Sequence, residues 1–213
     1  MKTTLCDLRI NGIGLAMAIG LASTLVVGAA HAAPEVNAPA PEFSGLTTSG
    51  ETVSLANFKG KTLVLEWTNH DCPYVRKHYG SNNMQTLQKE TTADGVVWLS
   101  VISSAPGTQG HVEAAQADEL TVSRDAAPTA IILDPEGTIG KAYAARTTPH
   151  MYIIDAEGVL RYKGGIDDKP SSSKSSIEGA HNYVLAALAD MGAGREVADP
   201  VTRPYGCSVK YKS

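Results

Sequence analysis

The 213-residue chain predicts an α/β fold in which a central mixed sheet is flanked by helices. Two observations lead to this prediction. Strand-like apolar runs alternate with helix-like segments through residues 63–145, which is typical of parallel strands in a layered sheet. Two later apolar runs, 151–155 and 159–163, are joined by the turn Ala156-Glu157-Gly158 and predict a β-hairpin, which adds antiparallel edge strands.

Three apolar runs predict the central strands: Leu63–Trp67, 96–102 and 129–133. The first two are continuous in apolar character, as in strands that are buried on both faces, and the second is rich in β-branched residues. Residues 43–58 contain a Thr-Ser-Gly-Glu turn and predict either a short hairpin or a strand followed by a helical turn.

Four segments predict helices: 73–90, 111–124, 139–145 and 177–191. The first should bend or break at Gly80-Ser81-Asn82-Asn83, because glycine and asparagine are poor helix formers. The last places apolar side chains along one face, as expected of a helix that packs on a sheet. These side chains are Tyr183, Val184, Leu188 and Met191.

The first 32 residues predict a secretory signal peptide that is not part of the fold. Lys2 and Arg9 precede the apolar stretch 13–29, and Ala30-His31-Ala32 has the small-x-small pattern of a cleavage site. The stretch is at the lower edge of the roughly 20 residues that span a bilayer, so an uncleaved anchor is the alternative interpretation. We expect a periplasmic protein with no stable membrane association after cleavage.

Cleavage would leave three parts: an entry segment 33–41, one domain over 42–195 and a tail over 196–213. The entry segment is rich in proline and alanine and is expected to be extended and mobile. The full chain has a net charge of −4, and removing the two basic residues and one acidic residue of the leader makes it −5. This mild, dispersed negative charge argues against nucleic-acid binding.

Cys72 lies where a buried strand ends and a helix begins, directly before Pro73. Proline is favoured at the first helical position, so the side chain before it should face unpaired backbone amides and the positive end of the helix dipole. Cysteines at such positions are stabilised as thiolates. The carboxylate of Asp71 opposes this effect, because a nearby anion disfavours a thiolate. The position predicts an activated sulfur nucleophile.

Five segments of the chain carry a resemblance to a known family: NHDCPYV at 69–75, Thr148-Pro149 before Met-Tyr-Ile-Ile, the turn at 155–158, GIDD at 165–168 and YGCSVKY at 205–211. Together they resemble the thioredoxin-like redoxins, and most closely their peroxiredoxin-like, thiol-specific-antioxidant branch. The resemblance covers roughly residues 40–211. It implies a thioredoxin-like fold with a C-terminal tail that carries a cysteine, and with an insert between the second strand and the helix that follows it.

The resemblance also implies that Pro149 is a cis-proline beside the active sulfur. Such a bond would expose the backbone of Thr148 to a bound partner. It would also bring Arg146, Thr147 and His150 close to Cys72.

The chain departs from the family pattern at several positions. Thioredoxins have a second cysteine three residues after the first, where this chain has Val75. Peroxiredoxins have proline seven residues before the cysteine and threonine or serine three before it, where this chain has Leu65 and Asn69. Thr68 is one position away and could still supply a hydroxyl. Some relatives have a cysteine where this chain has Thr147. Both the usual dithiol and the usual peroxide pocket are therefore incomplete.

A Cys72 thiolate could attack a peroxide, which gives a sulfenic acid, or the sulfur of a disulfide. Either product needs a second thiol, and after cleavage the candidate is Cys207. Its tail could fold back or reach another subunit, which leaves a homodimer open. The main hypothesis is an exported thiol oxidoreductase with Cys72 as attacker and Cys207 as resolver. It would act on peroxide or disulfide, take electrons from an unidentified thiol, and use no cofactor or metal.

Three other side chains are candidates for supporting roles. The fixed charge of Arg146 could hold the thiolate and polarise a bound oxygen. His70 and His150 could tune the thiol or carry a proton, because histidine titrates near neutral pH. The alternative is that Arg146 is a surface residue and that the histidines are ordinary loop residues.

Two alternative functions stay open from the sequence. Cys72 and Cys207 could form a permanent disulfide in a non-catalytic domain, since a bridge across so long a loop would stabilise the fold by about 4–5 kcal/mol. Cys72, His70 and His150 could instead bind copper, although the chain lacks the Cys-x-x-x-Cys pair usual in copper proteins of this fold.

Overall fold

The computed structural model describes residues 1–2 and 33–212. The predicted signal peptide and its cleavage site lie almost entirely outside the described residues. Within the part of the chain that is described, no helix is both long enough and apolar enough to cross a bilayer.

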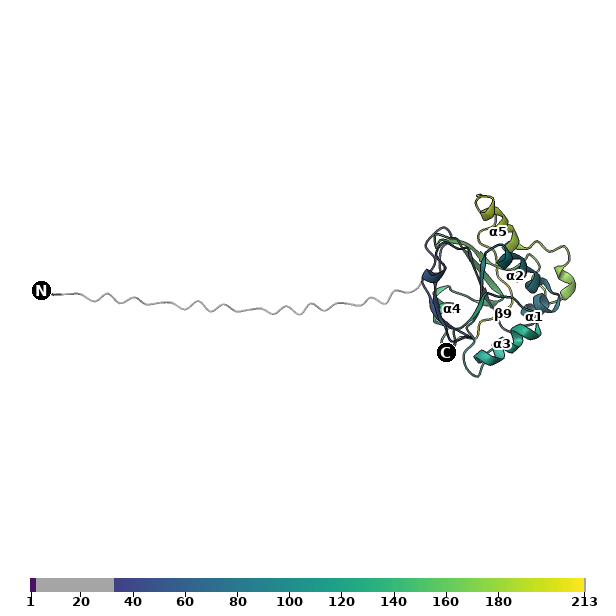
Figure 1. Ribbon diagram of the computed structural model, residues 1–213, viewed down its shortest axis with the longest axis horizontal. Helices are drawn as coiled ribbons and strands as arrows, with labels where there is room; N and C mark the ends of the chain where they lie inside the picture. The colour runs from purple at the N-terminus through teal and green to yellow at the C-terminus, as the bar shows by residue number, and fades with distance from the viewer. Residues whose placement is uncertain (3–32, 213) are drawn as a thin grey trace. The chain divides into compact units, whose positions relative to one another are not determined.

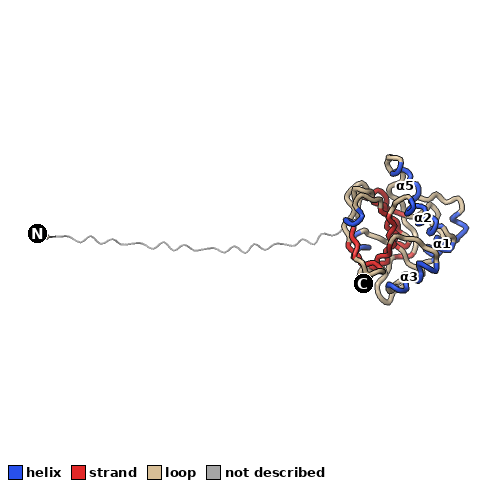
Figure 2. Tube along the Cα trace, viewed as in Figure 1, coloured by secondary structure: helices blue, strands red, loops and turns tan. Residues whose placement is uncertain are grey.

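A seven-stranded mixed sheet, drawn in red in Figure 2, forms the centre of residues 33–212. Its strands are β1 (Ser44–Thr47), β2 (Thr52–Ser54), β3 (Leu63–Trp67), β4 (Val97–Ile102), β5 (Ala130–Leu133), β7 (His150–Ile154) and β8 (Leu160–Gly164). Their order across the sheet is β2-β1-β5-β4-β3-β7-β8. The β3–β4 and β4–β5 pairs are parallel, and the β3–β7 and β7–β8 pairs are antiparallel. The predicted parallel strands and edge hairpin are confirmed.

Helices cover both faces of this sheet (Figure 1). They are α1 (Pro73–Gly80), α2 (Asn83–Ala93), α3 (Ala114–Ser123), α4 (Thr138–Ala142) and α5 (Tyr183–Gly192). Figure 1 shows α4 on one side of the sheet and α1, α2, α3 and α5 on the other. The predicted break in the 73–90 helix is confirmed, and Asn82 there adopts a left-handed conformation with φ 62°.

Two segments differ in detail from the prediction. The last helix begins at Tyr183 and not at residue 177, because the side chain of Asn182 caps it by accepting the amides of Val184 and Leu185. The residues before it form the 3₁₀ helix η2 (Lys174–Ile177). In segment 43–58 both alternatives occur together, since the β1–β2 hairpin is followed by the 3₁₀ helix η1 (Leu55–Phe58).

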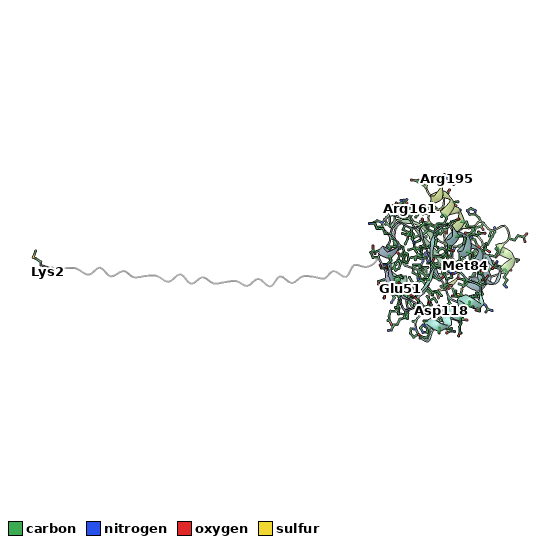
Figure 3. All side chains as sticks on the ribbon, viewed as in Figure 1. Lys2, Glu51, Met84, Asp118, Arg161 and Arg195 are labelled. Carbon is green, nitrogen blue, oxygen red and sulfur yellow. The ribbon has the colours of Figure 1, made fainter. Side chains whose placement is uncertain are left out.

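The alternation of side chains along β3 divides the core into two layers. Leu63 and Trp67 pack with Tyr143, which follows α4, whereas Val64 faces the layer under α1, α2 and α5. Met84 of α2 belongs to this second layer and lies among closely packed side chains in Figure 3. Cys72 is buried in the same layer. Cys72 therefore lies on the face of the sheet that α1, α2 and α5 cover.

The entry segment 33–41 is bonded to the β7–β8 hairpin, although we expected it to be mobile. The amides of Asn37 and Ala40 donate to the carbonyls of Leu160 and Gly158, and the amide of Leu160 donates back to Ala38. These bonds are possible because edge strand β8 leaves backbone groups unpaired on its outer side.

A second, two-stranded sheet pairs β6 (Thr147–Thr148) with β9 (Cys207–Ser208). We did not predict it, because strands of two residues carry no periodic signal. It attaches the C-terminal tail to the loop that precedes Pro149.

Candidate active site

The turn between β3 and α1 is held by Asn69. Its side-chain oxygen accepts the amide of Asp71 (2.9 Å), and its backbone carbonyl accepts the amide of Cys72 (3.1 Å). Its side-chain amide donates to the carbonyl of Gln109 (3.2 Å). Asn69 thus bonds the turn to the loop after β4, and this fixes Cys72 as the residue that precedes α1.

The sulfur of Cys72 is fully buried and contacts backbone atoms from two other segments. It lies 3.0 Å from the carbonyl oxygen of Thr148 and 3.4 Å from the amide nitrogen of Cys207. The sequence predicts that backbone amides of the first turn of α1 face this sulfur, but the side chain makes no capping bond to them. The amide that reaches the sulfur comes from the tail instead.

The bond between Thr148 and Pro149 is cis, as the resemblance implied. Thr148 is paired with Cys207 in the β6–β9 ladder, and its carbonyl oxygen contacts the sulfur of Cys72. The residue before Pro149 therefore lies beside both cysteines. The tail folds back onto its own chain. Within the described residues Cys72 and Cys207 are both free thiols, the first buried and the second half-buried.

The thiol of Cys207 is held in its protonated form. Burial raises its pKa to about 12, together with its hydrogen bond to Cys72 and the negative charge that Cys72 carries as a thiolate. The positive charge of Lys210 partly opposes this rise. Cys207 therefore keeps its proton and can donate a hydrogen bond to the sulfur of Cys72.

A buried polar cluster that we did not predict lies next to the two cysteines. The hydroxyl of Tyr205 donates to Asp167 and lies 3.1 Å from both Lys77 Nζ and His78 Nε2. The side chains of Lys77 and His78 are 0% exposed, and that of Asp167 is 4% exposed. The GIDD and YGCSVKY segments contain Asp167 and Tyr205, but nothing local in them shows that the two residues meet.

Arg146 and Thr68 do not contact the sulfur of Cys72 in the described part of the chain. Arg146 is exposed, and its backbone carbonyl accepts the amide of Val209 (3.0 Å), so it helps to hold the tail. The hydroxyl of Thr68 is buried without a hydrogen-bond partner. It lines a cavity of about 40 Å³ under α3 that it shares with His70 and Arg124.

His150 is buried among aromatic and backbone groups. Its Nδ1 lies 3.3 Å from the amide nitrogen of Arg146 and 3.2 Å from the hydroxyl of Tyr152. Burial, with the positive charges of Arg146 and Lys163, lowers its pKa to about 3. The ring is therefore neutral at physiological pH, which contradicts the suggestion that it titrates there.

His70 is placed at the start of the turn that leads to Cys72. Its Nε2 lies 3.4 Å from Asp71, and burial lowers its pKa against the opposing charge of that carboxylate. Across residues 33–212, no three His, Cys, Asp or Glu side chains are arranged to hold a metal ion. Cys72, His70 and His150 consequently do not converge on one copper site.

A model of the AhpC/TSA family matches residues 36–163 of the chain, which include Cys72 and Pro149. The chain belongs to the AhpC/TSA family. The matched region ends before Asp167, Tyr205 and Cys207, so the tail and two of the four cluster residues lie outside it, whereas Lys77 and His78 lie inside it.

Individual proteins resemble the chain in sequence or in fold. The AhpC/TSA chain is 34% identical over 143 residues to "Thioredoxin-like protein YneN" of Bacillus subtilis, a match that covers 65% of this chain and 78% of the relative. A hypothetical protein from Sinorhizobium meliloti has the same fold, with a TM-score of 0.71, 18% identity, and coverage of 85% and 97% of the two chains. An uncharacterized conserved protein from Geobacillus kaustophilus also has this fold, with a TM-score of 0.69 and 24% identity. The match covers 84% of this chain and 93% of that protein. The thioredoxin-like fold is confirmed.

Proposed function

We propose that this AhpC/TSA protein is an exported thiol–disulfide oxidoreductase in which Cys72 and Cys207 of one chain form and break a disulfide. The observation that carries the proposal is the contact between the two cysteines. The amide of Cys207 reaches the sulfur of Cys72, and its thiol can hydrogen bond to that sulfur. The export part rests on the sequence of residues 1–32.

The reaction moves two electrons and two protons. The thiolate of Cys72 attacks one sulfur of a substrate disulfide and releases the other as a thiolate, which leaves a mixed disulfide on Cys72. The sulfur of Cys207 then attacks Cys72, the substrate leaves as a second thiolate, and the Cys72–Cys207 disulfide remains. The two protons of the protein thiols pass to the released thiolates. An external dithiol reverses the sequence.

Disulfide exchange fits the site better than peroxide reduction does. Arg146, the residue expected to polarise a peroxide, is exposed and does not contact the sulfur of Cys72 within residues 33–212. The second thiol, in contrast, is already in place. We therefore take peroxide reduction as an outcome for the test to detect and not as a second proposal.

The test measures the reduction potential of the Cys72–Cys207 pair in a Cys6→Ser background, in which these are the two remaining cysteines. The protein is equilibrated in glutathione buffers and the disulfide is counted by mass spectrometry. We expect a potential above about −300 mV, as for an exchange-active pair. A value well below −300 mV would identify a static structural bridge and contradict the proposal.

A peroxide pulse on Cys72→Ser and Cys207→Ser variants separates the two substrates. If disulfide exchange is the function, neither variant completes the reaction, because Cys72→Ser cannot start it and Cys207→Ser stops at the mixed disulfide. Wild type then consumes peroxide no faster than Cys72→Ser does. Rapid consumption that depends on Cys72 would assign a peroxidase instead.

A further inference from the structure

The β6–β9 ladder is too short to hold Cys207 in place by itself. It contains two residues on each strand, and isolated two-stranded pairings are marginally stable in water even when they are longer. Something else must therefore fix the tail where Cys207 meets Cys72.

Tyr205, two residues before Cys207, is bonded more extensively than its neighbours in the tail. Its hydroxyl donates to Asp167, and the pKa of this hydroxyl is raised by burial and by the charge of Asp167, so the proton stays on the oxygen. The same oxygen accepts from Lys77 Nζ at 3.1 Å. The ring of Tyr205 packs edge-on against the ring of Tyr74, with 5.8 Å between the centroids.

His78 supplies a third contact to this hydroxyl. The side-chain amide nitrogen Nδ2 of Asn83 lies 2.8 Å from His78 Nδ1, so Nδ1 accepts, and Nε2 carries the proton and donates to Tyr205. Burial and the charge of Lys77 lower the pKa of His78 to about 3, which keeps the ring in this neutral form. The hydroxyl of Tyr205 thus donates one hydrogen bond, to Asp167, and accepts two, from Lys77 and His78.

The network connects the two halves of the site through one helix. Lys77 and His78 belong to α1, the helix that begins directly after Cys72. Asp167 belongs to the segment after β8. In that segment the amide of Gly165 donates to the hydroxyl of Thr202 in the tail. Anchoring Tyr205 on α1 therefore positions Cys207 relative to the helix that carries Cys72.

We propose that Tyr205 is the positioning residue that holds Cys207 against Cys72 and so sets the reduction potential of the pair. This proposal rests on the proposed function, since it requires Cys72 and Cys207 to form a disulfide. The cluster keeps the local concentration of the Cys207 thiol high in the reduced protein. Disulfide formation then pays little additional chain entropy.

The experiment compares Tyr205→Phe with wild type in the Cys6→Ser background. Glutathione disulfide oxidises the two protein thiols to one disulfide and is itself reduced to two molecules of glutathione. The mass-spectrometric equilibrium constant of this exchange is the readout. Because the phenyl ring keeps its packing while the three hydroxyl contacts are lost, we expect the constant to fall by about tenfold, which raises the potential by about 30 mV.

Tyr143→Phe is the matched control. It also removes one tyrosine hydroxyl that holds a chain segment, the bond to the carbonyl of Pro41 (2.7 Å), but it does so on the opposite face of the sheet. Its equilibrium constant should stay within about twofold of wild type. An equal fall in both variants would reduce Tyr205 to a general stabilising residue and overturn the proposal.

Hydrogen exchange on the reduced proteins gives a second readout. In Tyr205→Phe the amides of Cys207 and Val209, which bond to Cys72 and Arg146, should exchange faster than in wild type. If Tyr205→Phe does not fold, His78→Gln, which removes one of the three contacts, should lower the equilibrium constant by roughly threefold.

The outcomes separate this inference from the proposed function. A wild-type potential below −300 mV rejects the exchange function. A wild-type potential above it with an unchanged constant in Tyr205→Phe rejects the positioning role alone.

Discussion

At the scale of single residues, two histidines lie in buried sites that disfavour the charged form of the imidazole ring. His78 is 0% exposed and lies beside Lys77, and His150 is 4% exposed and lies near Arg146. Burial is the main cause that lowers the pKa of each to about 3. In the unfolded chain both would titrate near their ordinary pKa of about 6.5.

This difference predicts an acid-sensitive fold. Between pH 6.5 and pH 3 the unfolded chain binds protons that the folded chain excludes, so stability is complete above pH 6.5 and falls as the pH drops. From pH 7 to pH 5 each histidine should remove about 2 kcal/mol of unfolding free energy. His150→Phe keeps the ring packing on Tyr152 and should lose about 2 kcal/mol less over this interval. Urea denaturation of wild type and His150→Phe at the two pH values measures these losses. Equal losses of unfolding free energy in both proteins would contradict the low pKa of His150.

At the scale of elements, the tail runs directly over the cis-proline loop. Gly206 has φ 142°, and a Cβ there would lie 2.0 Å from the carbonyl oxygen of Thr148. A backbone oxygen in a paired strand cannot move aside as the end of a flexible side chain can. The close approach of β9 to β6 therefore depends on glycine at this position.

Gly206→Ala should consequently displace Cys207 from Cys72. We expect the equilibrium constant for their disulfide to fall by about tenfold or more, measured in glutathione buffers, because the ladder cannot close around the added methyl group. Gly194→Ala is the control, since Gly194 also has a positive φ (68°) but has open space around its Cβ position. That variant should lose about 1 kcal/mol of stability from the backbone conformation alone, with an unchanged disulfide equilibrium. If Gly206→Ala has the same disulfide equilibrium constant as Gly194→Ala, then Cys207 can reach Cys72 without the close approach of β9 to β6.

At the scale of the whole domain, the tail connects parts that are far apart in sequence. It pairs with Lys163 of β8 at Val201, with Thr148 at Cys207, and with Ala105 through Lys210. The ring of Tyr211 lies where a Cβ at Gly137 or Gly140 would be, so the end of the tail packs on α4. The tail that begins at residue 196 is therefore packed on the domain and is not an independent structure.

A disulfide between Cys72 and Cys207 should stabilise this arrangement. It would link residues 135 positions apart, and such a loop corresponds to about 4–5 kcal/mol in the chain-entropy model. Because the two thiols already lie together in the reduced protein, we expect most of this value as the difference in unfolding free energy between oxidised and reduced forms. Guanidinium denaturation with and without reductant measures it. An oxidised form no more stable than the reduced one would show that the bridge distorts the site.

The sequence by itself determined the sheet strands, the break after α1, the edge hairpin and the place of Cys72 before Pro73. These features follow from apolar periodicity, from glycine and from proline, which act between residues a few positions apart. Resemblance to a family added the cis bond at Pro149, which no local pattern specifies. Only the tertiary structure decided that Cys207 reaches Cys72 within one chain, that Tyr205 enters a buried cluster, and that Arg146 stays away from the sulfur. The contacts of Tyr205 and Cys207 join residues 38 to 135 positions apart, and their geometry depends on how the completed sheet and helices pack.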